Sequence, residues 1–429
     1  MSHTRRQFVK KSGSAMLAST LGFNILTAQN FKHKINSDTL KVGLIGCGGR
    51  GSGAALQATL ADDNVVLTCM ADIFKDALDK SHKALMGENP EKILVDEEHK
   101  FVGWDSYKKV IDSDVDVVIL TTPPSFRPAH LEAAIEAGKH VFCEKPVAVD
   151  APGIRRVLAS AKKAKEKGLS LMSGFCWRHD IPKQETYKRI LDGSIGDVVS
   201  IYNTYNTGAL WYKDRKEGWT DNETMMRNWL YFNWLSGDHI AEQAVHSLDL
   251  MSWAYGDKLP VKVSGTGGRQ SRTEGKFGNV YDHFALVYDY GDGKMGYHFS
   301  RQQKDTSRAY DISMMGDQGR AYINVFKEHK IMNDNPWEWS GEWSNMYQNE
   351  HNTLFAGIRS GDVFNDGELM ANSTMLAIIG RMVAYTGETL TWEDAMNSEE
   401  VLGPTIDQYK WDMDWPLAAV AQPGITKFS

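Results

Sequence analysis

The chain has 429 residues, a length that accommodates two domains with separate hydrophobic cores. Hydrophobic residues make up 42% and charged residues 24%, as in ordinary globular proteins, and the formal net charge is −7. With this negative charge we expect no nucleic-acid partner, and without an apolar run of 18 or more residues we expect no membrane span.

The N-terminus resembles a twin-arginine export signal. A basic stretch that includes Arg5-Arg6 precedes a weakly apolar run from Ala15 to Leu26, and Ala28 offers a cleavage edge. We therefore expect a signal over residues 1–28, a polar linker over 29–39, and a periplasmic location. The alternative is a basic amphipathic start on a cytoplasmic protein.

None of the four cysteines forms a CxxC pair, and each lies in or beside a predicted strand or turn: Cys47, Cys69, Cys143 and Cys176. We interpret them as small buried residues rather than disulfide partners or metal ligands. Folding in the reducing cytoplasm before export would explain an exported protein that needs no disulfides.

The apolar run Leu40–Ile45 leads directly into Gly46-x-Gly48-x-x-Gly51, and an Ala-rich segment follows. This pattern predicts a strand, a tight turn and a helix whose free N–H groups and positive dipole end would bind a pyrophosphate. A second predicted strand ends at Asp72, where an acidic residue would accept hydrogen bonds from an adenosine ribose.

Strands and helices alternate in the first half of the chain, which predicts a doubly wound parallel sheet over residues 40–174. The predicted strands are Leu40–Ile45, Val65–Ala71, Lys100–Val102, Val115–Thr121, His140–Cys143 and Ser170–Gly174. The predicted helices are Gly53–Leu60, Phe74–Met86, Ser106–Ile111, Pro128–Ala137 and Pro152–Lys167.

From about residue 175 the pattern changes to strands joined by Gly/Asp turns, which predicts an α+β domain with a largely antiparallel sheet over 175–390. The predicted strands are Val198–Asn206, Val261–Gly267, His283–Tyr290, Lys294–Ser300, Tyr310–Met315 and Arg320–Asn324. Helices are predicted at Ile240–Tyr255, 348–360 and 369–386, and we expect residues 391–429 to pack back as a C-terminal extension.

Glu144-Lys145-Pro146 follows a predicted strand at the edge where open α/β sheets bind ligands. A lysine there can reach substrate, although an exposed loop lysine is the commoner case. Further on, Glu242 and His246 lie four residues apart and would share a helix face, where the carboxylate could orient an imidazole base. A metal site formed by His239, Glu242 and His246 is a rival interpretation, although nothing else in the sequence supports it.

Five of the 13 tryptophans fall within 43 residues: Trp211, Trp219, Trp229, Trp234 and Trp253. Aromatic faces could cover the C–H face of a sugar while nearby polar groups bind its hydroxyls. Alternatively, most of these tryptophans belong to the core or to a dimer interface.

Five features together resemble the Gfo/Idh/MocA oxidoreductases, which include glucose–fructose oxidoreductase and inositol dehydrogenase. They are the Gly46–Gly51 loop, Asp72, Thr122-Pro123, Glu144-Lys145-Pro146 and His246. The resemblance covers about residues 40–390. It implies a Rossmann domain followed by an α/β domain with an open, mostly antiparallel sheet.

The resemblance also implies roles for individual residues. Lys145 would hydrogen-bond the reacting hydroxyl, and His246 would remove its proton as hydride leaves for nicotinamide C4. The cofactor site would include Gly46, Gly48, Gly49, Arg50, Gly51, Asp72, Thr122, Pro123, Glu144 and Lys145. The family usually has Asp four residues before the histidine, whereas this chain has Glu242 as the third catalytic candidate.

Substrate contacts are expected from Arg178, Trp211, Tyr212, Trp229 and His239. Asp72 favours NAD over NADP, and no metal is expected. The leading hypothesis is an oxidoreductase acting on a secondary CH–OH group of a sugar, glycoside or cyclitol, with tightly bound cofactor. The alternatives are an NAD-dependent, redox-neutral glycosidase or lyase and a non-catalytic sugar sensor. A homodimer or homotetramer is expected.

Overall fold

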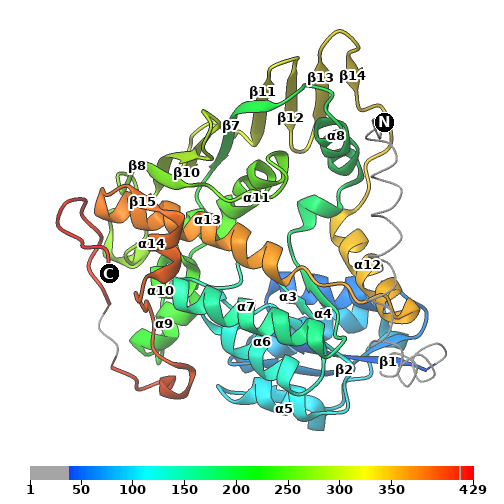
Figure 1. Cartoon of the computed structure of the whole chain (residues 1–429). Coiled ribbons are helices and arrows are strands. Elements are labelled where there is room, and N and C mark those ends of the chain that lie inside the picture. Colours follow the sequence, from blue (N-terminus) through cyan, green and yellow to red (C-terminus); the bar gives the residue numbers. More distant parts are fainter. Residues whose placement is uncertain (1–37, 415–416) are drawn as a thin grey trace, which may run out of the picture.

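The structure is a computed structural model that describes residues 38–414 and 417–429 (Figure 1). The first half of the chain forms a six-stranded sheet in the order β3-β2-β1-β4-β5-β6, with every neighbouring pair parallel. Its strands are β1 (Leu40–Ile45), β2 (Val65–Asp72), β3 (Lys100–Val102), β4 (Val117–Leu120), β5 (His140–Cys143) and β6 (Leu171–Ser173). This strand order is that of a dinucleotide-binding sheet.

Helices cover both faces of this sheet, so its central strands are apolar throughout. In β4, Val117 and Ile119 face one hydrophobic cluster, whereas Val118 and Leu120 face another. The helices of this half are α3 (Gly49–Leu60), α4 (Lys75–Glu88), α5 (Ser106–Asp112), α6 (Arg127–Glu136) and α7 (Ala151–Glu166).

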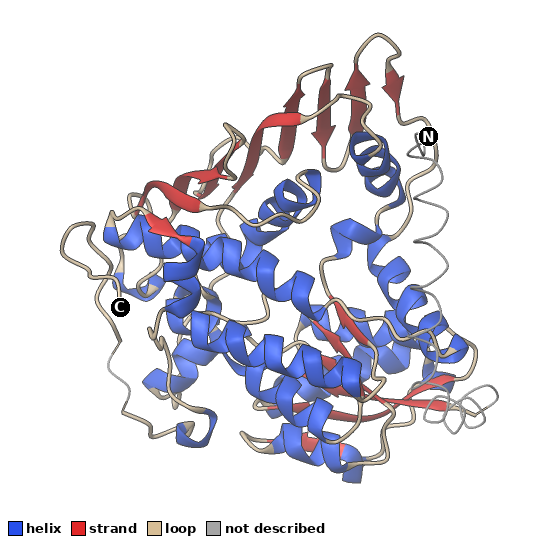
Figure 2. Cartoon of the chain, viewed as in Figure 1, coloured by secondary structure: helices blue, strands red, loops and turns tan. Residues whose placement is uncertain are grey.

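The second half contributes a nine-stranded sheet in the order β14-β13-β12-β11-β7-β10-β9-β8-β15 (Figure 2). Only β7 and β10 pair in parallel; the other neighbours are antiparallel. The strands are β7 (Val198–Thr207), β8 (Lys262–Gly268), β9 (His283–Asp289), β10 (Met295–Gln302), β11 (Asp311–Gly316), β12 (Arg320–Asn324), β13 (Glu328–Met332), β14 (Trp337–Glu338) and β15 (Leu390–Thr391). The alternating burial along β9 shows that only one face is covered by the core.

Two long helices connect the halves. α13 packs on α7 of the parallel sheet and on β8 of the second sheet, and α12 returns to pack on α3 (Figure 1). The α-helices of this half are α8 (Ile181–Leu191), α9 (Asp221–Arg227), α10 (Asn233–Ser236), α11 (Val245–Ala254), α12 (Met346–Ser360), α13 (Gly367–Thr386) and α14 (Trp392–Asn397).

The short helical turns of the chain include several that border the pocket and the candidate catalytic residues. They are η1 (Pro90–Lys92), η2 (Glu97–His99), η3 (Pro124–Phe126), η4 (Cys176–His179), η5 (Trp229–Tyr231), the π-helix η6 (Ile240–Ala244), η7 (Gly275–Phe277) and η8 (Ile406–Gln408).

The fold class predicted from the sequence is confirmed, a parallel sheet followed by a mostly antiparallel one. The sequence did not predict the helices α8, α9, α10 and α14 or the strands β13, β14 and β15. Two of these strands are only two residues long, too short to show an alternating pattern. α8 carries mostly polar residues, which leaves little apolar periodicity to recognise.

All four cysteines are buried and unpaired. Among the described residues, no helix is both long and apolar enough to cross a membrane. The predicted export signal, residues 1–28, lies outside the described part of the chain.

Candidate active site

The glycine loop turns sharply where β1 ends. Gly46 has a φ of +98°, a conformation that glycine adopts without strain. A Cβ on Gly46 would lie 2.8 Å from the carbonyl carbon of Thr121, so the turn packs directly on the end of β4. A Cβ on Gly51 would overlap the Gly46 carbonyl group, which shows how closely α3 approaches the strand.

α3 begins beside open space. Its N-cap, Gly48, makes no side-chain capping bond, and the first turn contains no acidic residue. A Cβ on Gly48 or Gly49 would meet no heavy atom within 4 Å. The free N–H groups and the positive end of the helix dipole are therefore available to an anion such as a pyrophosphate.

The Asp72 carboxylate is held next to this loop by two backbone N–H groups. Cys47 donates to Oδ2 at 2.7 Å, and Phe74 donates to Oδ1 at 2.8 Å. Burial raises the pKa of Asp72, although these two hydrogen bonds oppose that shift. The carboxylate has a fixed orientation in which it can accept hydrogen bonds from a ribose.

A pocket opens at the carboxyl ends of β1, β2 and β4, where the strand order reverses. Five of the predicted cofactor residues line it, namely Gly46, Gly48, Asp72, Thr122 and Pro123. Its aromatic walls include five residues that the sequence did not indicate: Phe74, Trp104, Tyr107, Phe126 and Tyr409. Such a lining of apolar faces with a few fixed polar groups suits an adenosine.

These residues fit a nicotinamide dinucleotide. Trp104 Nε1 is buried, and it finds no acceptor among the residues that the structure describes. Buried N–H groups are normally hydrogen-bonded, so this donor is free for a bound ligand. The pocket thus offers a glycine-lined helix start for phosphates, a carboxylate for ribose and aromatic faces for a base.

Lys145 connects the edge of the parallel sheet to the second half of the chain. It follows β5, and its Nζ donates a hydrogen bond to the carbonyl oxygen of Glu242 in η6. Arg127 is buried and donates from Nη1 to the carbonyl oxygen of Pro146 at 2.5 Å, which fixes the turn after Lys145. This role of Arg127 was not predicted from the sequence.

His246 lies in the first turn of α11 among aromatic rings. Its imidazole stacks on Trp177, with ring centroids 4.8 Å apart and planes 23° apart, and meets Phe175 edge-on at 5.9 Å. Burial, with the positive charges of Lys145 and Lys183, lowers the pKa of His246 well below its ordinary value. The ring is therefore neutral and able to accept a proton.

The predicted pairing of Glu242 with His246 is wrong. His246 Nδ1 and Glu242 Oε2 are both buried, and neither has a partner among the described residues. The expected α-helix over Ile240–Tyr255 begins as the π-helix η6, and α11 starts only at Val245. The segment between the two residues therefore changes from π-helical to α-helical winding and is not the regular α-helix that the prediction assumed. Burial raises the pKa of Glu242.

Residues 40–174 match the profile of the GFO/IDH/MocA oxidoreductase family, described as an NAD-binding Rossmann fold. Residues 184–322 match the profile of the GFO/IDH/MocA C-terminal domain. The chain belongs to the GFO/IDH/MocA family.

Two curated relatives illustrate the range of the family. The chain is 26% identical over 257 residues to 2,7-anhydro-N-acetylneuraminate hydratase of Escherichia coli, covering 60% of this chain and 60% of that protein. It is 22% identical over 332 residues to myo-inositol 2-dehydrogenase of Thermotoga maritima, covering 75% and 89%. A structure of levoglucosan dehydrogenase with NADH and levoglucosan matches with a TM-score of 0.66 at 18% identity, over 82% of this chain and 99% of that one. This last match shows the shared GFO/IDH/MocA fold.

Arg50, a predicted cofactor residue of the family loop, reaches two carboxylates. Its Nε lies 2.5 Å from Glu144 Oε1, and its Nη2 lies 3.3 Å from Glu350 Oε1 of α12. Burial, the negative charge of Glu144 and that of Asp366 raise the pKa of Glu350, while Arg50 opposes the shift. The predicted residues Arg50 and Glu144 are thus tied to each other, and the sequence missed Glu350.

Arg178, a predicted substrate residue, is engaged in ion pairs. Its Nε lies 2.9 Å from both carboxylate oxygens of Asp249, and its Nη2 lies 2.6 Å from Asp257 Oδ1. The Asp249 side chain is fully buried. In this structure the guanidinium therefore joins η4 to α11, and a contact with substrate stays a prediction.

Of the predicted aromatic substrate residues, Tyr212 and Trp229 pack against one hydrophobic cluster, whereas Trp211 lies at the surface. Trp211 is 44% exposed in the loop after β7. Tyr212 packs against Tyr231 and Phe277, with ring centroids 5.9 and 6.1 Å apart. Trp229, in η5, lines the pocket beside the glycine loop. The structure brings Trp229 to the candidate cofactor site and does not gather the three into one cluster.

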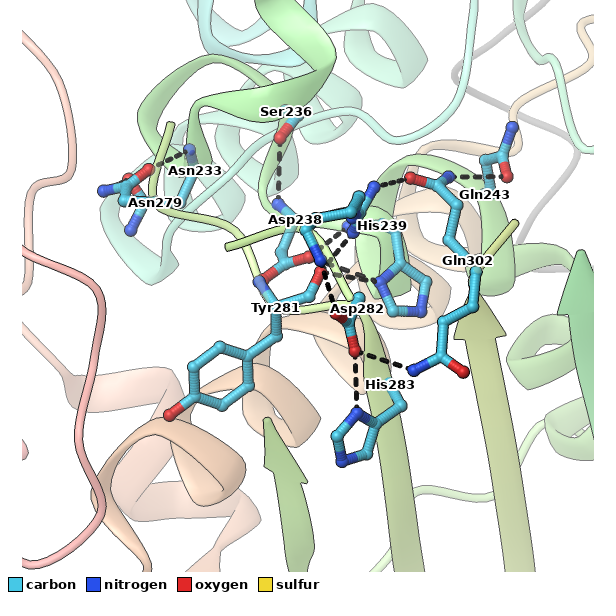
Figure 3. Close-up of polar contacts among 12 residues, drawn as sticks. Asn233, Ser236, Asp238, His239, Gln243, Asn279, Tyr281, Asp282, His283 and Gln302 are labelled. Atoms are coloured by element: carbon cyan, nitrogen blue, oxygen red, sulfur yellow. Dashed lines mark hydrogen bonds and ion pairs between the residues drawn. The ribbon is translucent and has the colours of Figure 1, made fainter. Parts of the chain in front are cut away.

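His239 is buried and lies in a polar network with Asp238 and Tyr281 (Figure 3). Its Nδ1 lies 3.4 Å from Asp238 Oδ1 and 3.4 Å from the carbonyl oxygen of Tyr281. Asp238 in turn accepts a hydrogen bond from Tyr385 at 2.6 Å. Within the described part of the chain, no group of three or more His, Cys, Asp or Glu residues could hold a metal ion.

Proposed function

We propose that this protein is an NAD-dependent oxidoreductase that acts on a secondary hydroxyl of a sugar, glycoside or cyclitol. The observation that carries the proposal is the position of Lys145, which follows β5 at the carboxyl edge of the parallel sheet, donates to the Glu242 carbonyl oxygen in η6, and lies near enough to His246 for its charge to lower the pKa of the imidazole. Ligands bind at this edge in open α/β sheets. Membership of the GFO/IDH/MocA oxidoreductase family supports the same reaction class.

Asp72 is the basis for proposing NAD rather than NADP. Its carboxylate is fixed by Cys47 and Phe74, so it can accept hydrogen bonds from both ribose hydroxyls of the adenosine. A 2′-phosphate in the same place would meet a negative charge in a partly buried site, which is unfavourable.

Lys145 and His246 have separate roles in the proposed reaction. The Lys145 ammonium donates a hydrogen bond to the substrate hydroxyl oxygen and stabilises the negative charge that develops there. An imidazole nitrogen of neutral His246 accepts the hydroxyl proton. Bound NAD would accept the hydride from the same carbon, which leaves a ketone. The Trp177 ring holds the imidazole by stacking on one of its faces.

A second candidate function is a redox-neutral cleavage or hydration that proceeds through transient oxidation of a ring carbon. The similarity to a hydratase favours it, because a hydratase produces no net redox change. The buried Glu242, whose pKa is raised, could hold or release the extra proton that such an elimination requires.

We also propose export by the twin-arginine route and a homodimer or homotetramer. The basic and apolar start of the sequence supports export, and a fractionation of cells that finds the protein only in the cytoplasm would contradict it. For assembly, the outward face of the nine-stranded sheet exposes Tyr202, Phe299 and Met315 at 47%, 38% and 50%. A monomer mass by light scattering would contradict assembly.

The two candidate functions can be distinguished by the products that each reaction forms. The purified protein is incubated with NAD and a panel of sugars, cyclitols and aryl glycosides, and the products are identified by mass spectrometry. A keto product formed with one equivalent of reduced cofactor supports the oxidoreductase. Released aglycone or added water without net cofactor reduction supports the redox-neutral reaction. No reaction and no NAD binding would contradict both.

A further inference from the structure

The chain returns to the cofactor pocket near its C-terminus. Residues Leu402–Met413, here called the C-terminal strap, run from α14 down past α9 (Figure 1). Asn222 of α9 donates from Nδ2 to the carbonyl oxygens of Trp411, at 3.0 Å, and Met413, at 2.6 Å. The N–H of Leu402 donates to Asp150 Oδ2 at 3.2 Å. Both ends of the strap are therefore attached to other elements.

Between these attachments, the strap places side chains in the pocket wall. Ile406 and Tyr409 line the pocket together with Asp72 and Trp104. Tyr409 is only 8% exposed, and its ring centroid lies 4.6 Å from that of Phe126. The strap is thus part of the binding surface and not only a tail that packs elsewhere.

Aromatic contacts join the strap to both sides of the pocket. Tyr409 stacks on Trp104 at 5.4 Å, on the parallel-sheet side, and lies 6.0 Å from Trp234 of α10 on the other. Trp411 packs behind this row, 4.8 Å from Trp104 and 5.4 Å from Phe74. Large rings at such distances contribute both apolar burial and ring–ring attraction.

We propose that the C-terminal strap is a cofactor-retaining element that closes the Asp72 side of the pocket and sets the rate at which NAD leaves. The inference rests on the proposed function, since it presumes that the pocket holds NAD. A dinucleotide seated between the glycine loop and Tyr409 makes contacts with three distant parts of the chain. Its release breaks the contacts to the strap, so weakening the strap accelerates dissociation.

The strap lies outside the segments that the family profiles match, which end at residue 322. Its four aromatic partners lie just after β2 and β3 and in the short helices η3 and α10: Phe74, Trp104, Phe126 and Trp234. Retention of the cofactor by the strap therefore depends on C-terminal residues that the family profiles do not match.

The direct test measures the dissociation of NADH from the full-length protein. The complex of the protein with NADH is mixed with excess NAD in a stopped-flow instrument, and the change in NADH fluorescence is followed. We expect the double variant Tyr409→Ala/Trp411→Ala to release NADH at least about tenfold faster than the unaltered protein, because two ring contacts are lost on the strap. The control Val401→Ala changes a residue that is 61% exposed and directly precedes the strap, and its rate should not change.

A double variant that remains folded by circular dichroism and releases NADH within about twofold of the unaltered rate would overturn the retaining role. That result would leave the proposed function intact. An unaltered protein that binds neither NAD nor NADH would instead overturn both proposals.

A second measurement needs no substitution. Amide hydrogen exchange of the unaltered protein is compared with and without saturating NAD. Residues 405–413 should gain protection on binding, since contact with the ligand suppresses local opening of the strap. Unchanged protection in this segment, with increased protection around Gly46 and Asp72, would contradict the inference even if the variants failed to fold.

Discussion

We propose that Lys145 and His246 act on the same substrate hydroxyl, although 100 residues separate them in the sequence. The Lys145 ammonium is anchored on the Glu242 carbonyl oxygen, and its positive charge helps to keep His246 neutral. The two side chains are therefore coupled through charge as well as position. The Lys145 ammonium supplies a hydrogen-bond donor in a fixed position, and the neutral His246 imidazole supplies a nitrogen that can accept a proton.

Lys145→Ala and His246→Ala should each lower turnover by about two orders of magnitude or more, the usual range for loss of a general base or of a charge-stabilising donor. Binding of NAD should persist, because neither side chain lines the glycine-loop pocket. Steady-state rates and NAD titrations measure the two effects. Lys304→Ala, at a site 79% exposed, is the matched control. Turnover near the unaltered rate in either variant would remove that residue from the mechanism.

Asp72→Ala should weaken NAD binding more than NADP binding. The change removes the acceptor for the ribose hydroxyls and also removes the negative charge that a 2′-phosphate would meet. Calorimetric titration of the variant with each dinucleotide checks the ratio of the two dissociation constants. Equal losses for both cofactors would show that Asp72 does not discriminate between them.

At the scale of elements, η4 and α11 are joined by the Arg178–Asp249 ion pair, whose carboxylate is fully buried. Removing one partner of a buried pair leaves an uncompensated charge, which costs more than the pair itself contributes. Ser373 donates to the same carboxylate at 2.7 Å but carries no positive charge.

Arg178→Ala should therefore lower the free energy of unfolding by about 3–5 kcal/mol, the cost of leaving a buried charge unpaired. Urea denaturation measures the loss. Arg215→Ala is the control, since its ion pair with Asp221 is exposed and should contribute less than about 1 kcal/mol. If Arg178→Ala kept full stability but lost affinity for the sugar, the substrate role predicted from the sequence would be supported instead.

α13 begins at another carboxylate, that of the half-buried N-cap residue Asp366. Burial raises the pKa of Asp366 to about 7, although Ser173 donates its N–H to Oδ2 at 3.1 Å. An unfolded chain releases this proton near its ordinary value of about 4. Between about pH 4 and pH 7 the folded state holds more protons, so rising pH destabilises the protein over this window.

Asp366→Asn should remove this pH dependence, because an amide cannot ionise and its oxygen can still accept from Ser173. The free energy of unfolding is measured in urea at about pH 5 and about pH 8. Its fall between these two pH values should be smaller in the variant than in the unaltered protein, by about 1 kcal/mol or more. Asp305→Asn, at a site 84% exposed, should follow the unaltered protein. An equal fall of the free energy of unfolding between the two pH values in all three proteins would contradict the assignment of this pH dependence to Asp366.

Local features of the sequence predicted local features of the fold. The glycine loop could be identified because strand, turn and helix follow one another without interruption, and Lys145 because Glu144-Lys145-Pro146, after the buried strand β5, resembles the motif of the family. The contact between Arg50 and Glu350 spans 300 residues and depends on how α12 packs. The π-helix was missed for a different reason, since Ile240–Ala244 has the same apolar composition that an α-helix would have.

Across the whole molecule, the pocket is assembled from parts that meet only in the folded chain. The parallel sheet supplies the glycine loop and Asp72, the α9–η5 region supplies Trp229, and the C-terminal strap supplies Tyr409. A ligand held by three such parts contributes to holding them together. We therefore expect bound NAD to stabilise the entire fold and to remain bound through purification.

The most direct test of this account uses the purified, unaltered protein with no cofactor added. The protein is denatured, and any nicotinamide dinucleotide that it releases is identified and quantified by chromatography and mass spectrometry. We expect about one equivalent of NAD or NADH per chain, with little NADP. A protein that carries no dinucleotide, and that binds none when NAD is supplied, would contradict the central claim.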